Sequence, residues 1–580
     1  MVTKNNELSF LVRLAVNEAY TEIPICESAT VDPNSNDNTE NQRSIVIAKS
    51  FISLTCPEFL SSPISHDDDR LVKVGRAIKD LLEAAKSDEE ENVKQSRLEA
   101  SLALIVEECI ALASGSIKVP KVQFGKTNLE MPIVTLGCMR FQQSWMPGIK
   151  MDGVADDCQE NLKNIISYAV KDLGINHIET ARGYGSSEVQ IGEILKKMFD
   201  DGEIKREELI IQVKVGAKST AKEFRGTLET SFKNLKLNYV DLFSFHGVNM
   251  EKDFDFIFNN GENGNCYDVV EEYIKAGKIR HVGFTSHGRV DLIRRVIETD
   301  KFDYANIHYH AFGSYTASGE GETAGNLQNI RLMNEKNMGV FIISPYDKGG
   351  RLYAPSRKLR SLTLPDLEPL AYGSSWLWNH GELVDDKAHI HTIVCGAARP
   401  SDLDQPAIGA FFHQERREDM IEKTRKVTGR LHQAALDVLG ERWMGSWHIG
   451  LHNCSFYDEK IQFGQIVGLY NILKAYGMLG YCKDRYGTFE GNSKSWDINL
   501  SSKENIEKLG GWGWMPGCDT DPKNDYIIEL ENVPIENKEQ VLEALRFVQK
   551  YCSKNCDATI PKEWETAYDM RPWNAYPERS

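Results

Sequence analysis

The chain has 580 residues, and because single domains usually run to roughly 100–200 residues, several structural units are expected. Hydrophobic residues make up 41% of the sequence and charged residues 26%, which excludes a disordered or fibrous protein. The 85 acidic residues outnumber the 68 basic ones, and the net charge of -17 argues against binding to nucleic acid or to an anionic membrane. Small molecules or other proteins are therefore the expected partners.

Neither a membrane span nor a metal site is predicted. No apolar run approaches the roughly 18 residues that cross a bilayer, and the opening segment MVTKNNELSF has no apolar signal region. We expect a cytoplasmic protein, or an organellar one if a targeting peptide was removed. The twelve cysteines are thinly spread without a C-x2-C pair, so we expect reduced thiols. His448, His452 and Cys454 lie close together, but packed or surface histidines are commoner than a metal site, and no metal is expected.

Two regions of the chain have a helical pattern and no constellation of catalytic residues. Residues 1–118 place apolar residues at three- and four-residue spacing and predict a helical N-terminal region with a capping, regulatory or oligomerising role, which leaves a homo-oligomer open. Residues 406–580 begin with a long helical pattern and predict a mainly helical C-terminal region. The aromatic residues of that region are expected to be core and loop-anchoring side chains.

The region between them, 119–405, has a different pattern. Short runs rich in Val, Ile, Leu and Phe alternate with amphipathic helical stretches; the runs are at 133–138, 175–180, 209–214, 239–245, 280–285, 302–307, 338–344 and 391–395. Strands that are apolar on both faces and separated by helices indicate a parallel sheet covered by helices. Eight such units predict an α/β fold, a (β/α)8 TIM barrel. No G-x-G-x-x-G follows the first strand, which disfavours a doubly wound dinucleotide-binding domain.

Candidate catalytic residues lie where the predicted strands end, because catalytic groups of such barrels occupy that face. They are Glu179, Tyr184, Lys214 and His246. A tyrosine titrates at about 10, and a nearby ammonium group such as that of Lys214 is expected to bring its pKa towards neutrality. Glu179 would hold Lys214, and His246 would donate a hydrogen bond to a substrate oxygen. The set predicts proton transfer to a carbonyl oxygen.

At these residues the sequence resembles the aldo-keto reductases. GINHIETARGYGSSEVQIGEIL is similar to the family's second-strand motif, with Tyr184, Lys214 in QVKV and His246 in LFSFHG at the catalytic positions. VQFGKTNLEMPIVTLGCM resembles the opening hairpin and first strand. The resemblance implies a barrel that binds NADPH and reduces aldehydes or ketones. Glu179 stands where the family usually has aspartate.

The resemblance also implies a set of cofactor-binding residues. Thr285, Ser286 and Asn306 match positions that hold the carboxamide, although the family usually has a glutamine at the last of them. Pyrophosphate and adenosine-ribose positions are matched by Ser344, Lys348, Gly396 and Arg399. Arg399 is the candidate for a 2′-phosphate, because a guanidinium can contact phosphate oxygens bidentately. The alternative is a surface arginine paired with an acid such as Asp402.

The substrate pocket and the C-terminal region leave alternatives open. Loops at the strand ends supply Arg140, Phe141, Trp145, Arg182, His308 and His310. Arg182 could bind an anionic substrate group or form a structural salt bridge. HNCSFYDEKIQFGQIVGLYN resembles a ferredoxin-bearing branch of the family, but the cysteines are too far apart for an iron–sulfur cluster. We expect an NADPH-dependent oxidoreductase acting on a small carbonyl compound; the alternative is a cofactor-binding regulatory or scaffold protein.

Overall fold

A computed structural model describes residues 118–567, with gaps at 147, 313–324, 365, 452–458, 510–516 and 522, and also residues 74 and 76–78. The helices predicted within 1–118 therefore lie almost entirely outside the described residues. None of the helices in the described part of the chain is long and apolar enough to cross a lipid bilayer.

Eight parallel strands close into a barrel in the order β10-β3-β4-β5-β6-β7-β8-β9. Their bounds are β3 (Val134–Gly137), β4 (His177–Glu179), β5 (Ile210–Val215), β6 (Val240–Phe245), β7 (Ile279–Thr285), β8 (Tyr304–Ile307), β9 (Gly339–Ile342) and β10 (Thr392–Gly396). Each strand lies within two residues of a predicted apolar run at both ends. The predicted (β/α)8 barrel is confirmed.

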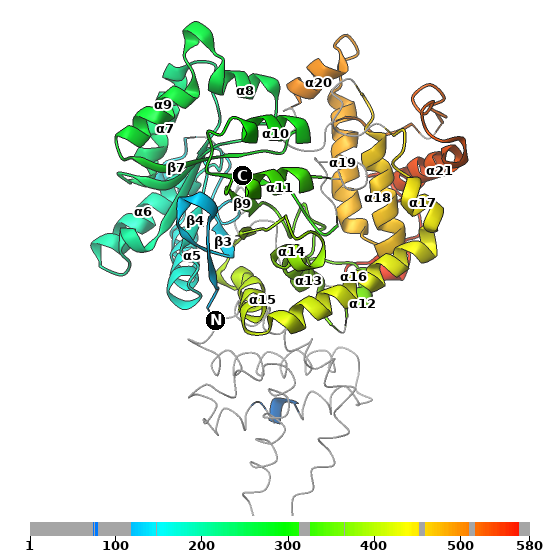
Figure 1. Ribbon diagram of the computed structural model, residues 1–580, viewed down its shortest axis with the longest axis horizontal. Coiled ribbons are helices and arrows are strands. Elements are labelled where there is room, and N and C mark those ends of the chain that lie inside the picture. Colours follow the sequence, from blue (N-terminus) through cyan, green and yellow to red (C-terminus); the bar gives the residue numbers. More distant parts are fainter. Residues whose placement is uncertain are drawn as a thin grey trace, which may run out of the picture.

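Helices cover the outside of the barrel (Figure 1). They are α5 (Asp156–Ser167), α6 (Ser187–Asp200), α7 (Ala221–Leu235), α8 (Glu251–Phe258), α9 (Cys266–Lys275), α10 (Val290–Glu298), α11 (Leu327–Glu335), α12 (Arg357–Thr363), α13 (Pro369–Trp378), α14 (His380–Leu383) and α15 (Asp404–Glu415). Residues at the helix ends determine where the helices begin and end, as α7 illustrates. Thr220 caps α7 by accepting a hydrogen bond from the Glu223 amide, and the helix ends at Lys236, which has a left-handed φ of 55°.

The N-terminal end of the barrel is closed by a hairpin of β1 (Lys121–Gln123) and β2 (Glu130–Pro132), which pair antiparallel. The ring of Phe124, between these strands, is fully buried, and a Cβ on Gly339 would lie 2.5 Å from it. Glycine is required there because the ring occupies the space of a side chain. Polar groups fill the layer above: Thr135 bonds to His177 at 2.9 Å and to Thr392 at 3.0 Å.

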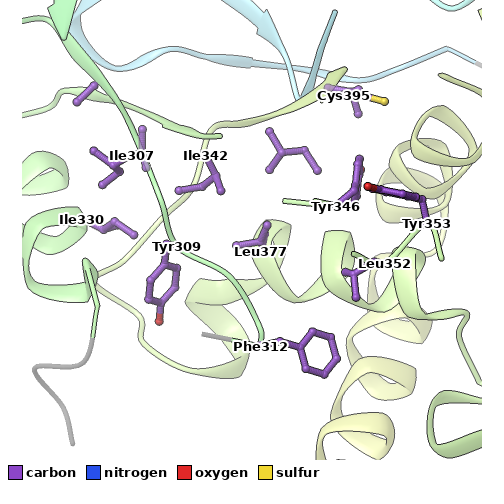
Figure 2. Close-up of a cluster of buried hydrophobic side chains, with 14 of the residues drawn as sticks. Ile307, Tyr309, Phe312, Ile330, Ile342, Tyr346, Leu352, Tyr353, Leu377 and Cys395 are labelled. Carbon is purple, nitrogen blue, oxygen red and sulfur yellow. The ribbon is translucent and has the colours of Figure 1, made fainter. Parts of the chain in front are cut away.

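The chain after the barrel forms a second group of helices beside it, coloured yellow to red in Figure 1. They are α16 (Arg417–Leu439), α17 (Glu441–Ser446), α18 (Phe463–Tyr476), α19 (Leu479–Ser495), α20 (Ser502–Lys508) and α21 (Ile535–Cys552). One hydrophobic core runs from the barrel into these helices. Figure 2 shows part of it, from Ile307 and Ile342 on the strands through Leu377 to Phe312. The Phe312 ring lies 5.8 Å from those of both Tyr372 and Tyr476.

Two of these helices contact loops at the C-terminal ends of the strands. Ile506 of α20 is buried against Met250, in the loop that follows β6, and Trp496 packs beside them. Met478, which precedes α19, meets Gly350 in the loop that follows β9. The strand ends of a (β/α)8 barrel are where its active site lies. The C-terminal helices therefore border the functional face.

Candidate active site

The four residues predicted to be catalytic lie together at the strand ends. The Lys214 ammonium, on β5, donates a hydrogen bond of 2.8 Å to the Tyr184 hydroxyl. It also forms an ion pair with the Glu179 carboxylate at the end of β4. The His246 ring meets the Tyr184 ring edge to face, with centroids 5.6 Å apart. Glu179 and Lys214 are only 3% and 2% exposed, so this pair is shielded from water.

The loop that carries Tyr184 is held tightly against the loop that follows β3. Gly185 has a left-handed φ of 50°, and a Cβ there would lie 1.9 Å from the Ser144 carbonyl oxygen. The Ser186 amide donates to that same oxygen at 3.0 Å, and the Ser186 hydroxyl accepts from the Gln143 amide. Only glycine fits at 185, and this close packing fixes the place of Tyr184.

Burial governs the protonation of these groups. It raises the pKa of Tyr184, so the expectation that Lys214 brings this pKa towards neutrality is wrong for the structure as it stands. Burial lowers the pKa of Lys214 well below its usual value, and the Glu179 carboxylate is in contact with its amine. The pKa of His246 falls to about 3, through burial and the charges of Lys214 and Lys348. At neutral pH the tyrosine is a protonated phenol and the histidine is uncharged.

Two of the predicted cofactor-binding residues lie on a tightly turned loop after β9. Ser344 has a left-handed φ of 53°, and a Cβ on Gly349 would lie 2.1 Å from the Pro345 carbonyl oxygen. Lys348, in this turn, has its pKa lowered to about 7 by burial and by the charge of Arg485, against the opposing effect of Asp347. The lysine therefore titrates near neutrality.

At the end of β10 the structure shows close contacts around Gly396 and Arg399. The Arg140 side chain lies across Gly396, where a Cβ would be 3.0 Å from its Cδ. Arg399 Nε is 3.2 Å from the Asp402 carboxylate, so the ion pair that the sequence left as an alternative is present. Asp402 also accepts the Ala398 amide at 2.8 Å. Arg399 is thus anchored beside the strand end by an acid that is itself fixed.

The other residues predicted to line the substrate pocket differ in their surroundings. Arg182 pairs with the buried Glu188 at 3.3 Å, which is the structural salt bridge left open by the sequence. Phe141 is buried and Trp145 is 39% exposed. His308 and His310 are buried after β8, with ring centroids 5.3 Å apart.

Part of the barrel is similar in sequence to a known protein family. Residues 134–361 match the Aldo/keto reductase family. The similarity to the aldo-keto reductases therefore lies within the barrel. The chain is 32% identical over 168 residues to "Aldo-keto reductase family 4 member C11" of Arabidopsis thaliana, covering 28% of this chain and 47% of the relative. It is 30% identical over 132 residues to "Aldo-keto reductase family 1 member C1" of Homo sapiens, covering 21% and 41%. It thus spans less than half of each relative.

Solved structures of similar proteins include aldo-keto reductase AKR11C1 from Bacillus halodurans, which is 17% identical with a TM-score of 0.39. The likeness covers 53% of this chain and 96% of that one. A second is the aldose reductase from Schistosoma japonicum, 16% identical with a TM-score of 0.36, covering 52% and 91%.

Aldo-keto reductases use nicotinamide cofactors, and one buried atom of this barrel tests the fit. Asn306 is fully buried on β8; its Oδ1 accepts from Gln212 at 3.3 Å, while its Nδ2 has no partner among the described residues. A buried unsatisfied donor costs about 1–3 kcal/mol, which a carboxamide oxygen would offset. Thr285 and Ser286 instead bond to the Gly247 amide and the Val248 carbonyl, and hold the loop after His246. The residues fit the group, with Asn306 as the contact.

Sequence reasoning missed two residues that border the candidate site. His287 follows the predicted Ser286 and hydrogen-bonds through Nδ1 to His308 Nε2. Its place directly after a strand end was a signal that could have found it. Arg485 is 1% exposed on α19 and lies beside Asp347 in the loop after β9. No pattern in the sequence links that helix to the barrel face.

Proposed function

We propose that this protein is an NADPH-dependent oxidoreductase that reduces an aldehyde or ketone to an alcohol, with Tyr184 as the proton donor. The observation that carries the proposal is the buried chain of contacts from Glu179 through Lys214 to the Tyr184 hydroxyl, whose last link is 2.8 Å. A phenol is a poor acid unless its phenolate is stabilised, and an ammonium group within hydrogen-bond distance provides that stabilisation.

The cofactor would lie along the strand ends. Asn306 would hold its carboxamide, and Lys348 and Arg399 would contact its phosphate groups. When bound, it supplies a hydride to the carbonyl carbon of the substrate. The preference for NADPH over NADH rests on Arg399, whose guanidinium would contact the 2′-phosphate.

The protein residues carry the proton and orient the carbonyl. Burial keeps the Tyr184 phenol protonated until the carbonyl oxygen gains negative charge. The phenol then transfers its proton to that oxygen, and Lys214 stabilises the phenolate left behind. His246, uncharged with a pKa of about 3, donates a hydrogen bond to the same oxygen and fixes its position. Glu179 keeps the Lys214 ammonium charged and in place.

The test is Tyr184→Phe, which removes only the proton donor. Turnover of a panel of aldehydes and ketones, followed by NADPH oxidation, should fall by about 100- to 10,000-fold. The NADPH dissociation constant should stay within about twofold. Tyr267→Phe is the matched control, because it removes a hydroxyl that bonds to the Lys301 carbonyl away from the strand ends.

Two outcomes would contradict the proposal. Full turnover in Tyr184→Phe would remove the tyrosine from the mechanism. A wild-type protein that binds NADPH but turns over nothing in the panel would favour the regulatory or scaffold alternative.

A further inference from the structure

Two ion pairs join α19 to the loop after β9, residues 343–352, here called the β9 loop. Arg485 Nη2 lies 3.8 Å from the Asp347 carboxylate, and Arg351 Nη1 lies 3.1 Å from the carboxylate of Asp484. Neighbouring residues of one helix therefore carry opposite charges, and each faces an opposite charge on the β9 loop. This pattern fixes how the helix is placed along the loop.

Two glycines in this contact leave room for side chains from the other segment. A Cβ on Gly350 would lie 2.9 Å from Met478 Cε, and a Cβ on Gly480 would lie 3.4 Å from Arg351 Nη1. Arg351 has a left-handed φ of 54°, which a residue with a side chain adopts only when its surroundings hold it there. The β9 loop thus takes its shape from α19 as well as from the barrel.

The side chain of Arg485 is almost fully buried, although an ion pair between a helix and a loop can form at the surface. It is 1% exposed, and its guanidinium lies 5.1 Å from the centre of the Tyr481 ring. Burying a guanidinium carries a desolvation cost, so its place next to the loop of the cofactor site calls for a role beyond attachment.

Lys348 is the group that connects this contact to the active site. The next residue, Gly349, lies against the ring of His310 after β8, since a Cβ there would be 3.0 Å from the ring. The charge of Lys348 also lowers the pKa of three strand-end histidines, which are His246, His287 and His308. Asp347 adjoins Lys348 in the chain and pairs with Arg485 of α19 at 3.8 Å. Lys348 therefore lies between the C-terminal helices and the barrel mouth.

We propose that Arg485 is a positioning residue of the cofactor site, which acts through Asp347 to place Lys348 beside the dinucleotide phosphates. This inference rests on the proposed function, since it assumes that Lys348 meets the cofactor. It makes α19 part of the cofactor site, although the helix lies far outside the residues that match the family.

The two partners of the ion pair have opposite effects on Lys348. Arg485 lowers the pKa of Lys348, and Asp347 raises it. Replacing Arg485 by glutamine should therefore raise this pKa above its value of about 7, and Asp347→Asn should lower it. Simple loosening of the loop would change the pH dependence in the same direction for both variants. The opposite signs separate a positioning role from a merely structural one.

The experiment measures the dissociation constant of NADP⁺ between pH 6.5 and 9, by quenching of tryptophan fluorescence in the full chain. A phosphate binds the protonated lysine, so affinity should be highest at low pH and begin to fall at about pH 7 in the wild type, by up to tenfold per pH unit. The onset of the fall should move to higher pH in Arg485→Gln and to lower pH in Asp347→Asn. Lys348→Met should remove it. NAD⁺, which lacks the 2′-phosphate that titrates at about pH 6, should show the same shifts.

Control variants distinguish a failure of this inference from a failure of the proposed function. Arg546→Gln breaks an exposed ion pair with Asp525 (2.7 Å) in the same C-terminal region and should leave the onset unchanged. If thermal unfolding shows that Arg485→Gln does not fold, Arg485→Lys takes its place; its charge is kept, so the onset should stay near the wild type while affinity falls three- to tenfold. Onsets that move together, or not at all, would overturn this inference. A wild type that binds no NADP⁺ would instead overturn the proposed function.

Discussion

The stability of Glu179→Gln should show whether the buried carboxylate keeps Lys214 charged. Both side chains are almost fully buried, and Lys214 is in contact with the carboxylate that the substitution neutralises. Without it, burial drives the lysine to its neutral form, because a lone ammonium group in such a site is costly. Relative to an unfolded-state pKa of about 10.4, holding a lysine neutral at pH 7 costs about 4–5 kcal/mol.

The sign of the pH dependence follows from the protons bound in each state. In Glu179→Gln the unfolded chain carries a proton on Lys214 that the folded protein lacks. Its stability should therefore rise with pH, by about 1.4 kcal/mol per unit. In the wild type the ion pair with Glu179 favours the charged lysine in the folded protein, so the pH slope should be smaller. Between pH 7 and 9 the variant should recover about 2–3 kcal/mol of its deficit.

Urea unfolding at pH 7, 8 and 9, followed by circular dichroism, measures both quantities. Glu188→Gln is the matched control: it removes another buried carboxylate, but its partner Arg182 does not titrate in this range. Glu179→Asp should retain most of the wild-type stability, since it keeps the charge. If Glu179→Gln shows the same pH slope as the wild type, the reasoning that Glu179 holds the lysine charged is wrong.

Two further changes test the cofactor and the catalytic loop. Arg399→Ala should raise the dissociation constant of NADPH by about 10- to 100-fold and hardly change that of NADH, because a charge-assisted hydrogen bond contributes about 1.5–3 kcal/mol; equal losses for both, measured by tryptophan quenching, would make Arg399 structural. Gly185→Ala should lower kcat/KM about 100-fold, since its Cβ would meet the Ser144 carbonyl at 1.9 Å and displace the Tyr184 loop. Gly226→Ala on α7, where no atom lies within 4 Å, should leave kcat/KM unchanged; equal losses in the two glycine variants would refute this account.

The barrel and the clustering of the four candidate residues could be predicted because local sequence determines both. Strands buried on two faces have apolar runs, and β5 and β6 are buried at every position. The closure of the barrel then brings the ends of those runs to one face, so that Tyr184, Lys214 and His246 lie together. No contact between distant segments has to be known for either step.

The effect of burial on pKa values and the ion pairs between segments distant in sequence could not be predicted. The pKa of Tyr184 was expected to move towards neutrality, but burial raises it, and burial depends on how the whole barrel packs. The partner of Arg182 depends on how α6 packs beside the loop. Arg485 reaches the β9 loop only through the packing of the C-terminal helices, which a strand-end pattern does not encode.

The aromatic cluster of Phe312, Tyr372 and Tyr476 has a consequence for how the protein folds. Phe312 follows the sixth barrel strand, while Tyr476 ends α18, and their rings pack in the same core. A chain cut after β10 would leave the apolar faces around Phe312 open to water and prone to association. The unit that folds cooperatively is thus larger than the segment that matches the family, 134–361. For this chain, we expect the barrel and its C-terminal helices to gain or lose their native packing together.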